Sequence, residues 1–224
     1  MPAPQTSDIS SLHAQAIAAF QRGEVEAAQA LIAQACAQPE APAIHHCHHA
    51  EMLLRGGKLA EAETVARRTA ARWPDSAEAW DILGAILADR GLLEESRDSF
   101  RAAVRLAPGL VSAHNNLALV LQRLGEFEAA ERCYRAALAS APDTPGVQLN
   151  FATLLRKLGR DQEGLAVVEA ILCRAPNTIK ALLLAADFER VLGHDQPALE
   201  RIDRALALTP GQLEALNRRA LLLC

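Results

Sequence analysis

The segment from Ile44 to His49 holds the densest group of side chains that could bind a metal ion. His45 and His49 are one helical turn apart, a spacing that places two imidazoles on one face of a helix. Cys47 adds a soft ligand type, but a helix would point it elsewhere. A short motif without structural context is often a false positive, so we expect no metal and no other cofactor. Metal binding by His45 and His49 stays open as the alternative.

No other part of the sequence carries a pattern typical of catalysis. There is no nucleophile elbow, no glycine-rich phosphate loop and no pair of carboxylates in a plausible pocket. We therefore expect no catalytic residues and no enzymatic activity.

Composition and charge narrow the remaining classes of function. A net charge of -4 and a pI near 6.0 give no electrostatic footprint for nucleic acid. The sequence shows no signal peptide and no apolar segment long enough to cross a bilayer. We expect a cytoplasmic protein that binds neither nucleic acid nor membrane, with reduced thiols. The cysteines are scattered, odd in number and without a CxxC pair: Cys36, Cys47, Cys133, Cys173 and Cys224.

Two kinds of helix-ending residue recur at a fixed interval of 34 residues. The glycines of this series are Gly23, Gly57, Gly91, Gly125, Gly159 and Gly193. The prolines are Pro74, Pro108, Pro142, Pro176 and Pro210. A glycine ends a helix at its C-terminal turn, and a proline cannot continue one. The two series therefore predict a repeated pair of helices.

The clearest copy of this pair runs from residue 77 to residue 110. Trp80, Leu83 and Gly84 lie at helical spacing and form one apolar face of the first helix. Ser96 and Phe100 lie on one face of the second helix. The small Gly84 and Ser96 would let the helices approach closely, and the large Trp80 and Phe100 would fill the space beside that contact.

The positions of Trp80, Leu83, Gly84, Phe100 and Pro108 resemble the tetratricopeptide repeat motif. The resemblance covers nearly all of the chain from residue 9 onward. It implies an all-α fold, a right-handed α-solenoid of helix-turn-helix hairpins. We expect a flexible N-terminal tail at residues 1–8 and a repeat array at residues 9–224. Its units would start near residues 9, 43, 77, 111, 145 and 179, with a half unit from 213.

The second copy of the motif is weak. His46 and His49 occupy positions that are normally large and packed, and we interpret them as replacements of Trp and Leu. We expect a less stable second repeat that is sensitive to pH near the histidine pKa.

The last predicted helix, from residue 213, is apolar. Leu216, Leu221 and Leu223 do not give it the polar outer face of a capping helix. Either the natural protein continues, or this end packs on a second copy. Self-association through this helix is therefore expected as a possibility of the chain as it stands.

The resemblance implies that the first helix of each hairpin lines the concave side of the array. Glu78 and Asp81 make this side acidic in the third unit, and later units are basic. Asn116 and Asn150 share one repeat position and could hydrogen-bond a peptide backbone. We expect an acidic protein or peptide partner, because a basic groove raises its local concentration. The predicted peptide-binding groove consists of Asn115, Asn116, Arg123, Asn150, Arg156, Lys157, Lys180 and Arg190.

These observations favour a protein–protein interaction scaffold or adaptor. The alternative is the non-catalytic arm of a larger bacterial enzyme, such as a transferase or oxygenase, whose catalytic domain lies beyond Cys224. A third interpretation is that the groove residues are ordinary surface polar groups needed for solubility.

Overall fold

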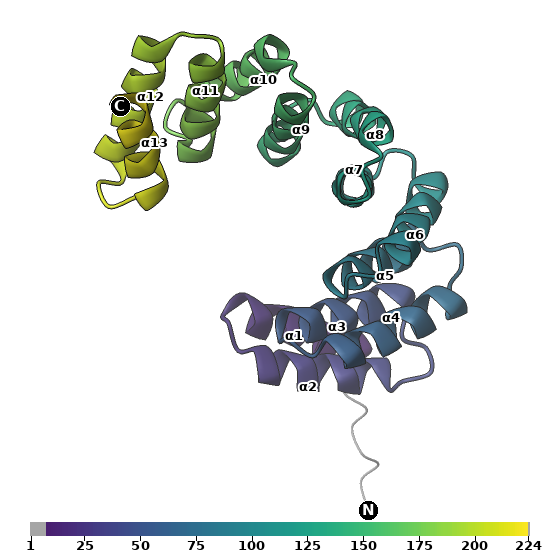
Figure 1. Cartoon of the computed structure of the whole chain (residues 1–224). Coiled ribbons are helices and arrows are strands. Elements are labelled where there is room, and N and C mark those ends of the chain that lie inside the picture. Colours follow the sequence, from purple (N-terminus) through teal and green to yellow (C-terminus); the bar gives the residue numbers. More distant parts are fainter. Residues whose placement is uncertain (1–7, 224) are drawn as a thin grey trace, which may run out of the picture. The chain divides into compact units, whose positions relative to one another are not determined.

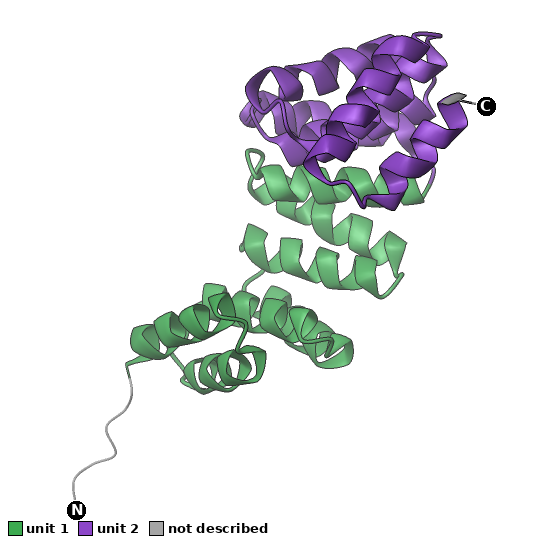
Figure 2. Ribbon diagram, turned by 90° about the vertical axis from the view of Figure 1, so that its left-hand side faces the viewer, with its two compact units in different colours: residues 1–124 green, residues 125–224 purple. Residues whose placement is uncertain are grey.

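The computed structural model describes residues 8–223, which form thirteen helices (Figure 1). The chain divides into two compact units, Met1–Leu124 and Gly125–Cys224 (Figure 2). The tail expected at residues 1–8 lies outside the described residues apart from Asp8. Unit 1 contains α1 (Ile9–Gln21), α2 (Val25–Cys36), α3 (Ala43–Arg55), α4 (Leu59–Arg72), α5 (Ala77–Asp89), α6 (Leu93–Leu106) and α7 (Val111–Arg123). Unit 2 contains α8 (Phe127–Ser140), α9 (Pro145–Lys157), α10 (Asp161–Arg174), α11 (Ile179–Val191), α12 (Asp195–Leu208) and α13 (Leu213–Leu223).

Each odd-numbered helix begins at the residue where a repeat was expected to start. The turn after α5 shows why the spacing is regular. Gly91 adopts a left-handed conformation, with φ of 79°, that a residue with a Cβ rarely adopts. The backbone N–H of Leu92 then donates to the carbonyl of Leu87 at 2.9 Å, which ends the helix with the hydrogen bond of a Schellman motif.

A close helix contact fixes the α5–α6 hairpin. A Cβ on Gly84 would lie 2.8 Å from the ring of Phe100, so only glycine fits this position without movement. Ser96 donates from its hydroxyl to the Gly84 carbonyl at 2.7 Å. Phe100 is buried, whereas Trp80 is half-buried and donates its indole N–H to the Pro74 carbonyl at 2.9 Å. The small residues thus set the distance between the two helices.

Unit 1 contains apolar clusters between neighbouring helices. One cluster includes Leu12 and Ile32 from the first hairpin and reaches Met52 of α3. Another includes Leu53 of α3 and Leu83 of α5, with alanines of α4 between them. Because each cluster is shared by adjacent helices, each hairpin depends on its neighbour for burial of its apolar face.

Unit 2 is built in the same way. Phe188 of α11 is fully buried and packs with Val168 and Ile171 of α10. A second cluster joins Ile202 of α12 with Ala215 of α13. In the described part of the chain, no helix has the length and apolar character needed to cross a membrane.

Candidate functional site

The first helices of unit 1 line a groove of about 470 Å³ between α3, α5 and α7. Glu51, Glu78 and Asp81 contribute three carboxylates to its lining, and Arg55 contributes a guanidinium that lies 3.9 Å from Glu51. The apolar part of the lining includes Ile82. Carboxylates outnumber cations along this groove, so unit 1 presents an acidic first-helix face.

Asp81 is held in place by side chains of α7. The Ser112 hydroxyl donates to one carboxylate oxygen at 2.8 Å, and the Asn116 amide donates to the other at 3.4 Å. Burial raises the pKa of Asp81, and these two hydrogen bonds oppose the rise. The Asn116 oxygen accepts from the Asn115 amide at 3.3 Å. Both ends of the Asn116 amide are therefore engaged within unit 1.

Arg123 is the third predicted groove residue in unit 1. It is exposed at the end of α7 and donates to the carbonyl of Ala88, at the end of α5, over 3.0 Å. The contact bonds one guanidinium nitrogen to the neighbouring repeat.

The first-helix face of unit 2 is organised around one buried carboxylate, Asp187 of α11. Arg156 of α9 donates to it at 2.7 Å. Arg218 of α13 donates to both of its oxygens, at 2.8 and 2.9 Å. Hydrogen bonding to Asp187 raises the pKa of Arg218, which also pairs with Glu214 at 2.8 Å. One carboxylate thus orients two guanidinium groups from the flanking repeats.

Sequence reasoning did not select Arg218. The signal was present, because Arg218 follows Asn116 and Asn150 at the same repeat position. The link through Asp187 was harder to see, since each arginine is 31 residues from it in the sequence.

The other predicted residues of unit 2 surround this arrangement. Lys157, Lys180 and Arg190 are exposed and form no ion pair within the described residues. Asn150 is half-buried on α9. Together with Arg156 and the newly found Arg218, these side chains give the first helices of unit 2 an excess of positive charge.

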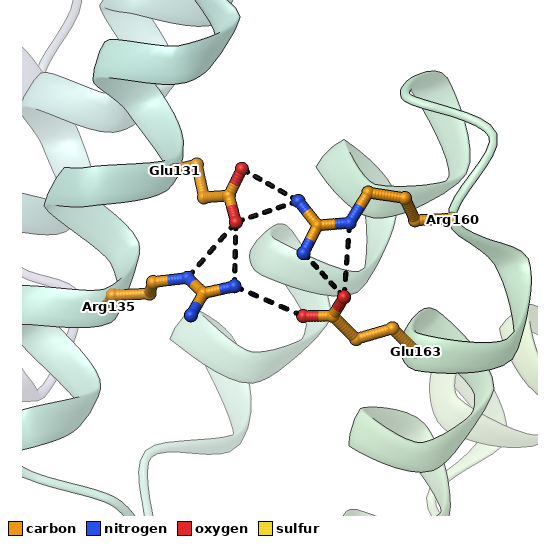
Figure 3. Close-up of polar contacts among 4 residues, drawn as sticks. All are labelled: Glu131, Arg135, Arg160 and Glu163. Carbon is orange, nitrogen blue, oxygen red and sulfur yellow. Dashed lines mark hydrogen bonds and ion pairs between the residues drawn. The ribbon is translucent and has the colours of Figure 1, made fainter.

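The second helices of unit 2 carry a different, balanced network (Figure 3). Glu131 of α8 accepts hydrogen bonds from Arg135 at 3.0 Å and from Arg160 at 2.8 Å. Glu163 of α10 accepts from Arg160 at 3.0 Å and from Arg135 at 3.3 Å. The hydrogen bond from Arg160 lowers the pKa of Glu131. Two carboxylates and two guanidiniums neutralise one another, so we interpret this ring as a link between helices.

The histidines of α3 separate into two environments. His45 stacks on His13 of α1 with ring centroids 4.0 Å apart, and nitrogens of His13 and His48 lie 2.7 Å apart. His49 instead lines a cavity between α2, α3 and α4. His45 and His49 therefore do not converge on one point. Among the described residues, no three His, Cys, Asp or Glu side chains are arranged to hold a metal ion.

The outer side of α13 is apolar, as its sequence indicated. Leu213, Leu216 and Leu221 are 75%, 42% and 73% exposed, and the side chain of Leu223 lies outside the described residues. Self-association through α13 stays a prediction.

Comparison with known families identifies the class of protein. Two models described as tetratricopeptide repeat match the chain, one at residues 47–111 and 115–178 and the other at residues 9–34. The first alone covers more than half of the sequence, so the chain belongs to the tetratricopeptide repeat family. Such domains generally mediate protein–protein interactions and are typically non-catalytic.

Solved structures agree with this assignment. PilW, a type IV pilus biogenesis factor, is 22% identical and gives a TM-score of 0.85 over 96% of this chain and 99% of its own. PilF of Pseudomonas aeruginosa is 20% identical, with a TM-score of 0.80 over 95% of this chain and 97% of its own. YrrB, described as a TPR protein with an unusual peptide-binding site, is 20% identical and gives 0.68 over 84% and 97%.

At these identities the likeness establishes the fold alone, and it confirms the predicted all-α tetratricopeptide class. No curated protein matches the chain in sequence.

Proposed function

We propose that this chain is a protein-binding scaffold and that the first-helix face of unit 2 holds an acidic segment of its partner. The observation that carries the proposal is the sharing of Asp187 by Arg156 and Arg218. One negative charge cannot neutralise two guanidiniums, so the group keeps a net positive charge. Its donors are already oriented, which reduces the entropy lost when a carboxylate binds.

The surrounding residues extend this basic face. Lys157, Lys180 and Arg190 are exposed on α9 and α11 and would attract acidic side chains before contact. Asn150 supplies an amide beside them. Such charges increase the association rate and specificity more than the raw affinity.

The proposed site is limited to the predicted residues that lie in unit 2. Asn115, Asn116 and Arg123 belong to unit 1, where Asn116 donates to Asp81 in a groove lined by three carboxylates. Those carboxylates would repel an acidic segment, so unit 1 is the wrong surface for this ligand.

Charge reversal on unit 2 tests the proposal. The intact chain is immobilised, its partners are captured from the source cell, and the capture is repeated with Lys157→Glu, Lys180→Glu and Arg190→Glu combined. These side chains have no ion pair to lose, so the variant should fold. We expect capture of the acidic partner to fall at least about ten-fold, and to weaken with salt in the parent, since screening acts over about 8 Å at physiological ionic strength.

The matched control reverses three exposed cations away from the first-helix faces: Lys58→Glu, Arg105→Glu and Arg132→Glu. It changes the net charge by the same amount and should capture the partner as the parent does. Equal loss in both variants would show that only net charge matters, and retention in the unit 2 variant would refute the site.

A further inference from the structure

A second cavity of unit 1 lies between α2, α3 and α4 and has a volume of about 220 Å³. His46, His49, Arg68 and Arg72 form most of its polar lining, and the indole of Trp73 also contributes. Methyl groups of alanines and a valine supply its apolar part. No carboxylate is among its lining residues. The cavity therefore combines an apolar wall with groups that attract an anion.

The next repeat shows how unusual this lining is within the chain. Four positions that hold apolar residues there hold imidazoles or guanidiniums here. The pairs, each 34 residues apart, are His46 and Trp80, His49 and Leu83, Arg68 and Ala102, and Arg72 and Leu106. Leu83 is buried and Trp80 packs against its cluster, so these register positions fill the hairpin elsewhere. Polar replacements in the second repeat leave space and hydrogen-bond donors in place of packed apolar groups.

The polar groups of the cavity are only partly satisfied within unit 1. Nε2 of His46 is buried and has no hydrogen-bond partner among the described residues. Arg72 lies 4.5 Å from the Trp73 ring centroid and donates to the Pro39 carbonyl at 3.0 Å. Arg68 is exposed and forms no ion pair in the described part of the chain. A carboxylate would give each of these groups a charge-assisted partner.

The charged groups around the histidines act in the same sense. Burial lowers the pKa of His46 most, and the charges of Arg72, His49, His45 and Arg68 lower it further. Burial also lowers the pKa of His49, with Lys58 adding to this effect and Glu61 opposing it. A bound anion would favour the protonated imidazoles, so its affinity should rise as pH falls.

We propose that this cavity binds one acidic side chain of a protein partner, as a contact separate from the first-helix face of unit 2. It is smaller than the 300–1,000 Å³ that is usual (roughly) for sites of drug-sized ligands, and it suits a single side chain. The methyl groups would contact the side-chain methylenes while Arg68 and Arg72 pair with the carboxylate. The inference rests on the proposed protein-binding function, but it concerns different residues.

The test uses the full chain and a minimal probe, N-acetylglutamate α-amide, followed by the NMR signals of the indole N–H groups. Trp73 lines the cavity and Trp80, the other tryptophan of the chain, does not, so Trp80 is an internal reference. We expect a saturable shift of the Trp73 signal, tighter at about pH 6 than at about pH 7.5. The double variant Arg68→Gln with Arg72→Gln should weaken it about ten-fold or more.

Three controls decide the outcome. N-acetylglutamine α-amide should give no saturable shift, since it lacks the charge. The double variant Arg67→Gln with Arg105→Gln, which removes two arginines outside the cavity, should bind like the parent. His49→Leu, which restores the residue type of the next repeat, should abolish the pH dependence contributed by that imidazole.

Equal shifts with the glutamine probe, inorganic phosphate binding as well as the glutamate probe, or binding unaffected by the Arg68 and Arg72 changes would overturn the inference. None of these results would alter partner capture through unit 2, which is measured with the Lys157, Lys180 and Arg190 variant. The two proposals therefore fail separately.

Discussion

At the scale of single residues, histidines replace larger groups in the first two hairpins. His13, His45 and His48 stack where α1 meets α3, with ring centroids 4.0 Å and 4.9 Å from the His13 ring. Burial first, and neighbouring imidazoles second, lower the pKa of both His13 and His45. The folded chain therefore resists protonation that the unfolded chain accepts. Stability from these groups is complete above the ordinary histidine pKa of 6.5 and is lost as pH falls through it.

Replacing one member of the stack should reduce this pH dependence. We expect the parent to unfold at a lower urea concentration at about pH 5.5 than at about pH 7.5, and His13→Asn to show a smaller difference. The comparison cancels other titrating groups, such as Asp81, whose raised pKa acts in the opposite direction. An unchanged pH difference in the variant would show that the stack does not take up the protons.

At the scale of helices, close contacts depend on single glycines. A Cβ on Gly164 of α10 would lie 2.3 Å from the ring of Phe188 on α11. Phe188 is fully buried, so its ring cannot move aside freely. The sequence shows Gly164 only as a residue of poor helix propensity, and the structure shows that it makes room for this ring.

The variant Gly164→Ala should therefore destabilise unit 2 by about 1–3 kcal/mol, the usual cost of overpacking, despite the gain of up to about 1 kcal/mol in helix propensity. Gly146→Ala is the matched control, because Gly146 lies in α9 and a Cβ there meets nothing within 4 Å. It should stabilise slightly. Urea unfolding of both variants measures the difference, and a stabilised Gly164→Ala would disprove the contact.

Helix boundaries were predictable because they depend on local chemistry. The left-handed turn at Gly91 and the helix end before Pro108 are written in those residues and recur every 34 positions. The pairing of Asp187 with two arginines was not predictable in the same way, because it depends on side-chain directions across repeats. The sequence also gave no sign of the cavity beside His46, since space between helices follows from packing rather than from residue type.

At the scale of the whole molecule, the two units present first-helix faces of opposite character. In unit 1 this face is a groove with the carboxylates of Glu51, Glu78 and Asp81. In unit 2 it carries the arginines on Asp187 and three exposed cations. A repeat array allows this difference because each hairpin needs only its neighbours for stability. Surface charge can then vary from repeat to repeat while the packing pattern is kept.

Site-specific photocrosslinking tests the central claim most directly. A benzophenone side chain replaces Asn217, which is exposed on α13 beside Arg218, or Gln162, which is exposed on the second helix α10. Neither change removes a charge. After irradiation with the captured partner, mass spectrometry identifies the attached peptide. The account predicts a crosslink from position 217 to a segment rich in Asp and Glu, and little from position 162. Crosslinking from position 162 alone, or from 217 to a segment without acidic residues, would contradict it.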